Sequence, residues 1–120
     1  MAREDRRTFY PLVNYGDPAK AMEWLEKAFG FAAHEVSRNE DGAIVHAEMR
    51  YDTGILMISQ AQGGGAGLYV AVDDPDAHFE RARAAGAEIT MGLTDQPYGS
   101  REYAARDPEG NDWYFGTYRP

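Results

Sequence analysis

The sequence has no cysteine and no long hydrophobic run. The missing cysteine excludes disulfides, thiol nucleophiles and thiolate metal ligands. No stretch approaches the ~20 consecutive apolar residues that a membrane helix needs. The charged start, residues 1–7, is followed by no apolar run of the kind found in a secretion signal. We therefore expect a cytoplasmic protein with no membrane partner.

Positive charge is also scarce. The 120 residues carry 12 Lys and Arg against 20 Asp and Glu, a formal net charge of −8. This balance argues against nucleic acid, because the phosphate backbone would be repelled. It would tolerate, or mildly attract, a cationic small molecule. With 43 % hydrophobic residues, the chain is suited to one compact domain spanning residues 1–120.

What the sequence does contain is an internal repeat. An Asp-Pro pair opens a helix-like stretch that ends at a glycine, and a turn glycine follows further along, in each half of the chain. The helix starts lie 57 positions apart, and the helix ends and turn glycines lie 56 apart: Asp17 and Asp74, Gly30 and Gly86, Gly54 and Gly110.

The repeat predicts two βαβββ modules, an α+β fold. Each module should present a curved sheet with its helix on the convex side, so that the concave sides form a cleft. A glycine-rich linker, residues 61–67, falls between the modules. The expected elements are a strand at 8–14, a helix at 19–29 and strands at 32–37, 44–51 and 55–60, then a strand at 68–72, a helix at 75–85 and strands at 88–91, 100–106 and 112–118.

Three segments resemble a known family. They are Ala28-Phe29-Gly30-Phe31, the alanine-rich run at 82–89, and the ending Arg106-Asp107-Pro108-Glu109-Gly110-Asn111. Together with the repeated βαβββ unit they resemble the vicinal oxygen chelate superfamily. That superfamily includes glyoxalase I, extradiol dioxygenases, fosfomycin-modifying enzymes and bleomycin-resistance proteins that only bind their drug. The resemblance implies the glyoxalase/bleomycin-resistance fold and a homodimer, with the cleft within one chain or shared between two.

The resemblance also implies four metal-ligand positions, one on each of four strands. They fall at Tyr10, Met57, Gly67 and Tyr114, and neither these residues nor their neighbours are His, Gln, Glu or Asp. Divalent metals need such nitrogen or oxygen donors. We therefore expect no metal and no other cofactor. The tyrosines and Met57 suit a planar or conjugated ligand, although Tyr10 and Tyr114 are equally compatible with a place in the core.

The strand at 44–51 alternates in polarity. Val45, Ala47, Met49 and Tyr51 share the face suited to the helix, which leaves His46, Glu48 and Arg50 on the other. His46 and Glu48 are candidate catalytic residues, as a base and its orienting partner or as ligands of a relocated metal. A charged strand face or a dimer seam is the alternative.

Two further candidates lie on the strand at 100–106. Arg101 and Tyr103 share one face, where the guanidinium of Arg101 is able to bind a ligand carboxylate or carbonyl oxygen. A surface ion pair is the alternative for Arg101. His78, among the charged residues of the second helix, is expected to be exposed, and His34 to lie on a strand surface.

These observations favour metal-free binding or sequestration of a small aromatic or cationic molecule, as in drug-resistance proteins. A lyase, isomerase or dioxygenase of the glyoxalase kind, with a relocated metal or acid/base chemistry, is the alternative. A third possibility is a non-catalytic partner domain whose cleft has lost its function.

Overall fold

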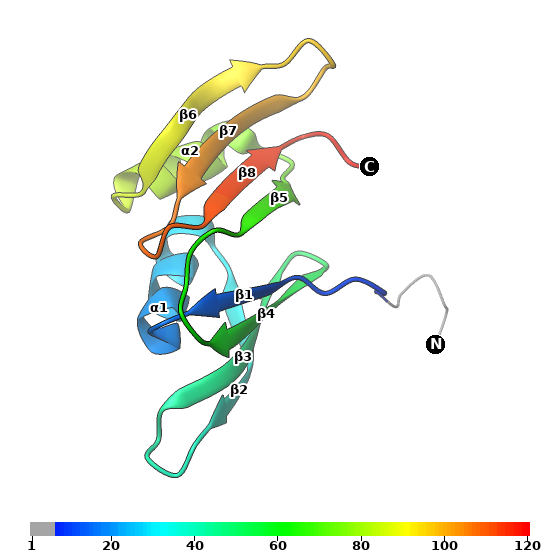
Figure 1. Ribbon diagram of the computed structural model, residues 1–120. Coiled ribbons are helices and arrows are strands. Elements are labelled where there is room, and N and C mark those ends of the chain that lie inside the picture. The colour runs from blue at the N-terminus through cyan, green and yellow to red at the C-terminus, as the bar shows by residue number, and fades with distance from the viewer. Residues whose placement is uncertain (1–6) are drawn as a thin grey trace.

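The computed structural model describes residues 7–120, and it has the expected α+β fold with two βαβββ modules (Figure 1). The strand orders are β1-β4-β3-β2 and β5-β8-β7-β6, and β1 and β5 run parallel to their neighbours β4 and β8. The elements are β1 (Leu12–Tyr15), α1 (Pro18–Phe29), β2 (Ala32–Arg38), β3 (Ile44–Tyr51), β4 (Gly54–Gln60), β5 (Gly67–Ala71), α2 (Pro75–Ala84), β6 (Glu88–Asp95), β7 (Arg101–Arg106) and β8 (Asp112–Gly116).

The helices begin as the Asp-Pro pairs predict. The Asp17 carboxylate accepts a hydrogen bond from the Lys20 amide at 3.1 Å, and Asp74 accepts one from Ala77 at 3.1 Å. Gly30 ends α1 in the left-handed conformation, at φ 80°. No helix among residues 7–120 is long and apolar enough to cross a membrane. The cytoplasmic location stays a prediction.

Two strands differ from their predicted bounds by four residues at one end, and the others by no more than two. β1 begins at Leu12, not at residue 8, because Pro11 has no N–H to donate to a strand ladder. β6 extends to Asp95, four residues past its expected end, and its register with β7 shifts on either side of Met91.

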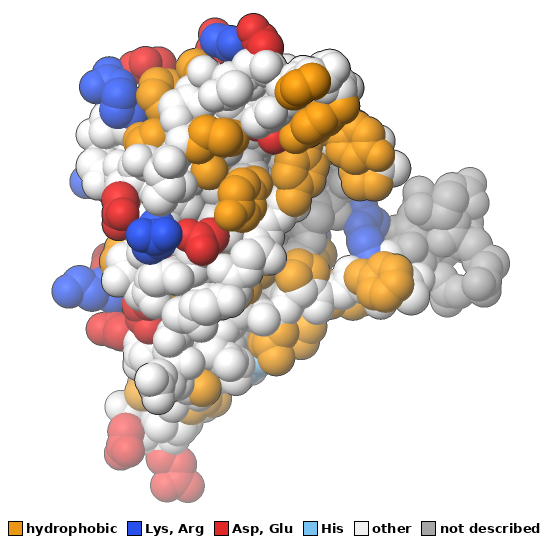
Figure 2. Space-filling view, turned by 45° about the horizontal axis from the view of Figure 1, so that its top comes forward, with side chains coloured by type: hydrophobic (Ala, Val, Ile, Leu, Met, Phe, Trp, Pro, Cys, Tyr) orange, Lys and Arg blue, Asp and Glu red, His pale blue; other side chains and the backbone are white. Residues whose placement is uncertain are grey.

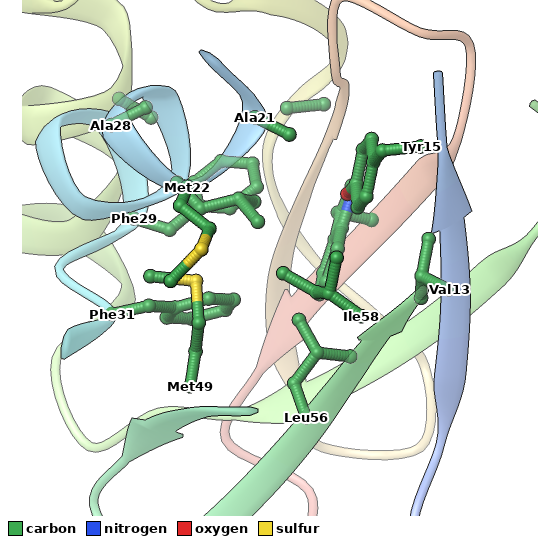
Figure 3. Packing of buried hydrophobic residues seen from close by; sticks show 14 of the residues in the cluster. Val13, Tyr15, Ala21, Met22, Ala28, Phe29, Phe31, Met49, Leu56 and Ile58 are labelled. Atoms are coloured by element: carbon green, nitrogen blue, oxygen red, sulfur yellow. The ribbon is translucent and has the colours of Figure 1, made fainter. Parts of the chain in front are cut away.

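The helices and the helix-facing sides of both sheets share one core. Phe29 at the end of α1 packs against Phe115 and Trp113 of β8, with ring centroids 4.7 and 5.5 Å apart. In Figure 3, Met22 and Phe29 face Met49 of β3 across this core. The opposite side of each sheet, which we call its outer face, therefore points away from the shared core.

A buried carboxylate ties the second module to the first. Asp107, in the turn between β7 and β8, accepts hydrogen bonds from the Tyr15 hydroxyl of β1 at 2.7 Å, the Trp113 indole at 3.0 Å and the Asn111 amide at 3.1 Å. Burial, followed by the bond to Asp107, raises the pKa of Tyr15. The turn that resembles a family motif is thus an intermodule hydrogen-bond centre.

The same turn also holds the start of α1. Glu109 accepts hydrogen bonds from the backbone amides of Gly16 at 2.6 Å and Asp17 at 3.0 Å. A side chain at Gly63 would collide with the Glu109 carboxylate. The glycine-rich segment between β4 and β5 therefore serves close packing as well as connection.

Asp107→Asn should lower the free energy of unfolding by about 3 kcal/mol or more. The NH2 group of asparagine cannot accept the hydrogen bonds that the carboxylate accepts, so donor would face donor. Tyr15→Phe removes one of those donors and should cost about 1–2 kcal/mol. Urea unfolding followed by tryptophan fluorescence measures both. Asp41→Asn, in an exposed turn, is the control and should stay within about 0.5 kcal/mol of wild type. Wild-type stability in Asp107→Asn would contradict the role of this carboxylate.

Candidate functional site

The outer face of the second sheet is rich in tyrosine. Tyr114 of β8 lies beside Tyr69 of β5 in the strand register, and both side chains are partly exposed. Tyr98 and Tyr118 lie next to them, and Glu102 of β7 completes a hollow of about 450 Å³. Figure 2 shows hydrophobic side chains gathered on the part of the surface where the second sheet and the C-terminal end lie.

The outer face of the first sheet is more mixed. Met57 of β4 lies between Leu12 of β1 and Glu48 of β3 in the register. Leu12 is exposed, while Met57 and Glu48 are half-buried. By strand position, Leu12 and Met57 in the first module correspond to Tyr69 and Tyr114 in the second.

The register shows which residues lie beside the four positions at which the resemblance implies metal ligands. Met57 is paired with Leu12, whereas Tyr10 precedes β1 and donates its hydroxyl to the Arg7 carbonyl at 3.3 Å. Tyr114 is paired with Tyr69, whereas Gly67 lies opposite Asp112. The strand neighbours of Met57 and Tyr114 are therefore Leu12 and Tyr69, each two residues further along the sequence than the position implied by the resemblance.

The side chains at the four strand-paired positions, Leu12, Met57, Tyr69 and Tyr114, do not fit a divalent metal. Leucine has no donor atom, and a methionine thioether is a soft, weak one. The Tyr69 hydroxyl already donates to the Tyr118 carbonyl at 2.6 Å, and burial raises the pKa of this phenol, which keeps it protonated. Residues 7–120 contain no group of three or more His, Asp or Glu side chains arranged to hold a metal ion.

The candidate catalytic pair lies on β3 as the alternation predicts. Ala47 and Met49 are buried against the core, and His46 and Glu48 are half-buried on the outer face. Within the described residues no hydrogen bond joins His46 to Glu48, and the ion-pair partner of Glu48 is His34 at 4.0 Å. The arrangement of a base with its orienting partner is therefore not formed.

Arg101 and Tyr103 lie on the side of β7 that faces α2, away from Tyr114. Arg101 forms ion pairs with Asp76 at 2.7 Å and Asp95 at 3.1 Å, and its bond to Asp76 is the main cause of a raised pKa. Tyr103 is 0 % exposed. A ligand on the tyrosine-rich face would reach neither side chain, so the structure does not group them with Tyr114.

His78 is 8 % exposed, so the expectation of an exposed side chain is wrong. Its Nδ1 lies 2.6 Å from the Tyr103 hydroxyl and its Nε2 lies 2.9 Å from the Phe29 carbonyl of α1. Because a carbonyl only accepts, Nε2 carries the proton and Nδ1 accepts from Tyr103. The prediction failed because the residues around His78 in the sequence are charged, which is typical of an exposed helix face. One of them, Arg81, also points toward α1 and donates hydrogen bonds to the Lys27 and Glu26 carbonyls.

A second hollow, of about 270 Å³, lies between the modules on the core side. Its walls include Phe31, Met49, Leu68 and Trp113. Of the four strand-paired positions it contains only Tyr69. Part of its wall is core side chains, and part is exposed residues such as Phe9, Asp52 and Arg119. The tyrosine-rich hollow instead lies on an outer face, beside the register pair Tyr69 and Tyr114.

Sequence reasoning found Tyr114 but missed Tyr69, Tyr98, Glu102 and Tyr118 as members of the tyrosine-rich hollow. Tyr98 comes from the loop after β6, and Tyr118 follows β8. Only the crossing of β8 between β5 and β7 brings these segments together. The alternation of β7 gave a weak signal, since it placed Glu102 on the face opposite Tyr103.

Residues 8–115 match the family model of the Glyoxalase/Bleomycin resistance protein/Dioxygenase superfamily. The chain belongs to this superfamily. The family resemblance and the fold class predicted from the sequence are thereby confirmed.

The chain is also similar to solved structures and to a curated protein. TioX from Micromonospora sp. ML1 is 36 % identical, with a TM-score of 0.80, over 92 % of this chain and 98 % of that one. The uncharacterized protein Mb0911c of Mycobacterium bovis is 32 % identical over 123 residues, 88 % of this chain and 80 % of the relative. A glyoxalase-related enzyme from Clostridium phytofermentans, 20 % identical with a TM-score of 0.79, shares the fold.

The stability of the protein should fall on mild acidification because of His78. Burial lowers the pKa of His78 below its ordinary value of 6.5, with Arg81 adding to the effect. Below about pH 6.5 the unfolded chain takes up a proton that the folded chain resists. The contribution is therefore complete above pH 6.5 and is lost as the pH falls from there toward the folded pKa.

Urea unfolding at pH 7.5 and pH 5.5 should show a loss of about 1 kcal/mol in wild type. His78→Gln should lack most of this difference, whatever its absolute stability. His46→Gln, on an outer face, should keep it. An unchanged pH dependence in His78→Gln would contradict the buried, neutral histidine.

Proposed function

We propose that this protein binds and sequesters a small planar molecule without a metal, using the tyrosine-rich outer face of its second sheet. The observation that carries the proposal is the register pair Tyr69 and Tyr114. Tyr114 is one of the positions at which the family resemblance implies a metal ligand. Aromatic rings at these positions offer stacking surfaces and no Lewis acid. The superfamily's description includes bleomycin resistance proteins, which supports a binding role.

The proposal includes a homodimer. A cleft with two walls needs a second outer face opposite the tyrosines, and the outer faces of one chain flank a shared core. The outer face of the first sheet in a second copy supplies such a wall, with Leu12 and Met57 exposed or half-buried at its centre. Burying these apolar side chains in the cleft and its rim favours association.

A catalytic role has less support. His46 and Glu48 form no hydrogen-bonded pair, and the four strand positions offer no metal donor set. We therefore propose binding and not turnover.

Binding of a neutral planar probe should raise the melting temperature. Acridone at 100 times its dissociation constant adds about 2.7 kcal/mol to the free energy of unfolding. Tyr114→Ala should lose this stabilisation while unfolding with nearly wild-type stability, because the side chain is 45 % exposed. Tyr10→Ala removes a side chain that is 46 % exposed and lies outside the register pair, so it is the matched control and should bind like wild type.

Two results would contradict the proposal. If Tyr114→Ala without ligand loses 3–5 kcal/mol of its free energy of unfolding, this ring belongs to the core. A rise of several degrees in melting temperature with Zn²⁺ or Mn²⁺, reversed by a chelator, would show that a metal belongs to the fold.

A further inference from the structure

We infer that the tyrosine-rich hollow recognises a positively charged group on the ligand, a protonated or quaternary ammonium, with Glu102 as its counter-ion. This inference rests on the proposed function and specifies its ligand class. It starts from a carboxylate that is 8 % exposed on the outer face of β7.

Glu102 lacks a cationic partner. Its Oε1 accepts a hydrogen bond from the Tyr98 hydroxyl at 2.9 Å, and within residues 7–120 no Lys, Arg or His forms an ion pair with it. The ion-paired arginines use other acids: Arg83 pairs with Glu80, Arg101 with Asp76 and Asp95, Arg106 with Glu88 and Asp112, and Arg119 with Asp73. Carboxylates buried to this degree are normally paired, so a cation at this place would gain a partner already removed from water.

The surrounding rings suit a cation. Tyr69, Tyr98, Tyr114 and Tyr118 line the hollow and are all partly exposed. The hydroxyls of Tyr69 and Tyr98 are already engaged, with the Tyr118 carbonyl and with Glu102. What remains for a ligand is largely aromatic surface, which attracts ammonium groups through the ring quadrupole.

Gly116 lets the carboxylate lie in this position. A Cβ at Gly116 would stand 2.5 Å from Glu102 Cγ, 2.8 Å from the Tyr69 hydroxyl and 3.0 Å from Ser100 Oγ. The Ser100 hydroxyl in turn accepts a hydrogen bond from the Tyr118 amide at 3.1 Å, which fixes the chain beside the hollow. The floor of the hollow is therefore closely packed at Gly116, where no side chain other than hydrogen would fit.

The electrostatic field of the whole protein also favours a cationic ligand. The formal net charge of −8 raises the local concentration of cations over the whole surface. This attraction is weakened by salt, whereas a contact with a nearly buried carboxylate is screened much less. Salt therefore separates the general attraction from the specific site.

The test compares two planar probes of similar shape, 9-aminoacridine, which is cationic at pH 7.5, and neutral acridone, by calorimetry in 0.15 M salt. Wild type should bind the cation at least tenfold more tightly. Glu102→Gln keeps an acceptor for Tyr98 but removes the charge, so it should lose most of this preference while its affinity for acridone changes less than about twofold. Glu40→Gln makes the same change in net charge at an exposed turn and should keep the preference.

Gly116→Ala provides a second variant, because its methyl group displaces the Glu102 side chain, and it should also lose the preference. Equal binding of the two probes by wild type would overturn the cation site and leave the proposed function standing. A full preference in folded Glu102→Gln would overturn it as well. Failure of both probes to bind would contradict the proposed function and this inference together.

Discussion

The hydrogen bonds to Asp107 are the constraint on which the arrangement of the two modules depends. A carboxylate removed from water must be satisfied, and its donors come from Tyr15 in the first module and from Asn111 and Trp113 in the second. His78 makes a second polar contact between modules at the end of α1. Between these two contacts the aromatic core around Phe29 closes. The helix-facing sides of both sheets are thereby largely committed to the core, and the outer faces stay clear of it.

Much of this fold follows from local sequence patterns. The Asp-Pro pairs at Asp17 and Asp74 satisfy helix amides within three residues, and the alternation around Met49 reports which side of β3 is buried. The burial of His78 depends instead on α1 packing across α2, a contact 49 residues away in sequence. The grouping of Glu102 with Tyr98 and Tyr118 likewise depends on strand order, which periodicity does not encode.

The turn between β7 and β8 and the tyrosine-rich hollow are separate parts of the second module. Asp107 and Glu109 hold the start of the first module, with no contact to the tyrosine-rich hollow. The hollow depends on Gly116 and on the outward-facing rings. The stabilising network and the proposed binding site therefore lie on opposite sides of the same sheet. On this proposal, changes on the outer face would alter ligand preference while the core and the Asp107 network stay intact.

Methyl NMR with labelled methionine tests the central claim, that the ligand binds between outer faces of two chains, most directly. Met57 lies on the outer face of the first sheet, whereas Met49 lines the hollow between the modules. Titration with 9-aminoacridine or acridone should shift the Met57 methyl signal and leave that of Met49 nearly unchanged. A large shift of Met49 with Met57 unaffected would place the ligand between the modules of one chain and contradict the account.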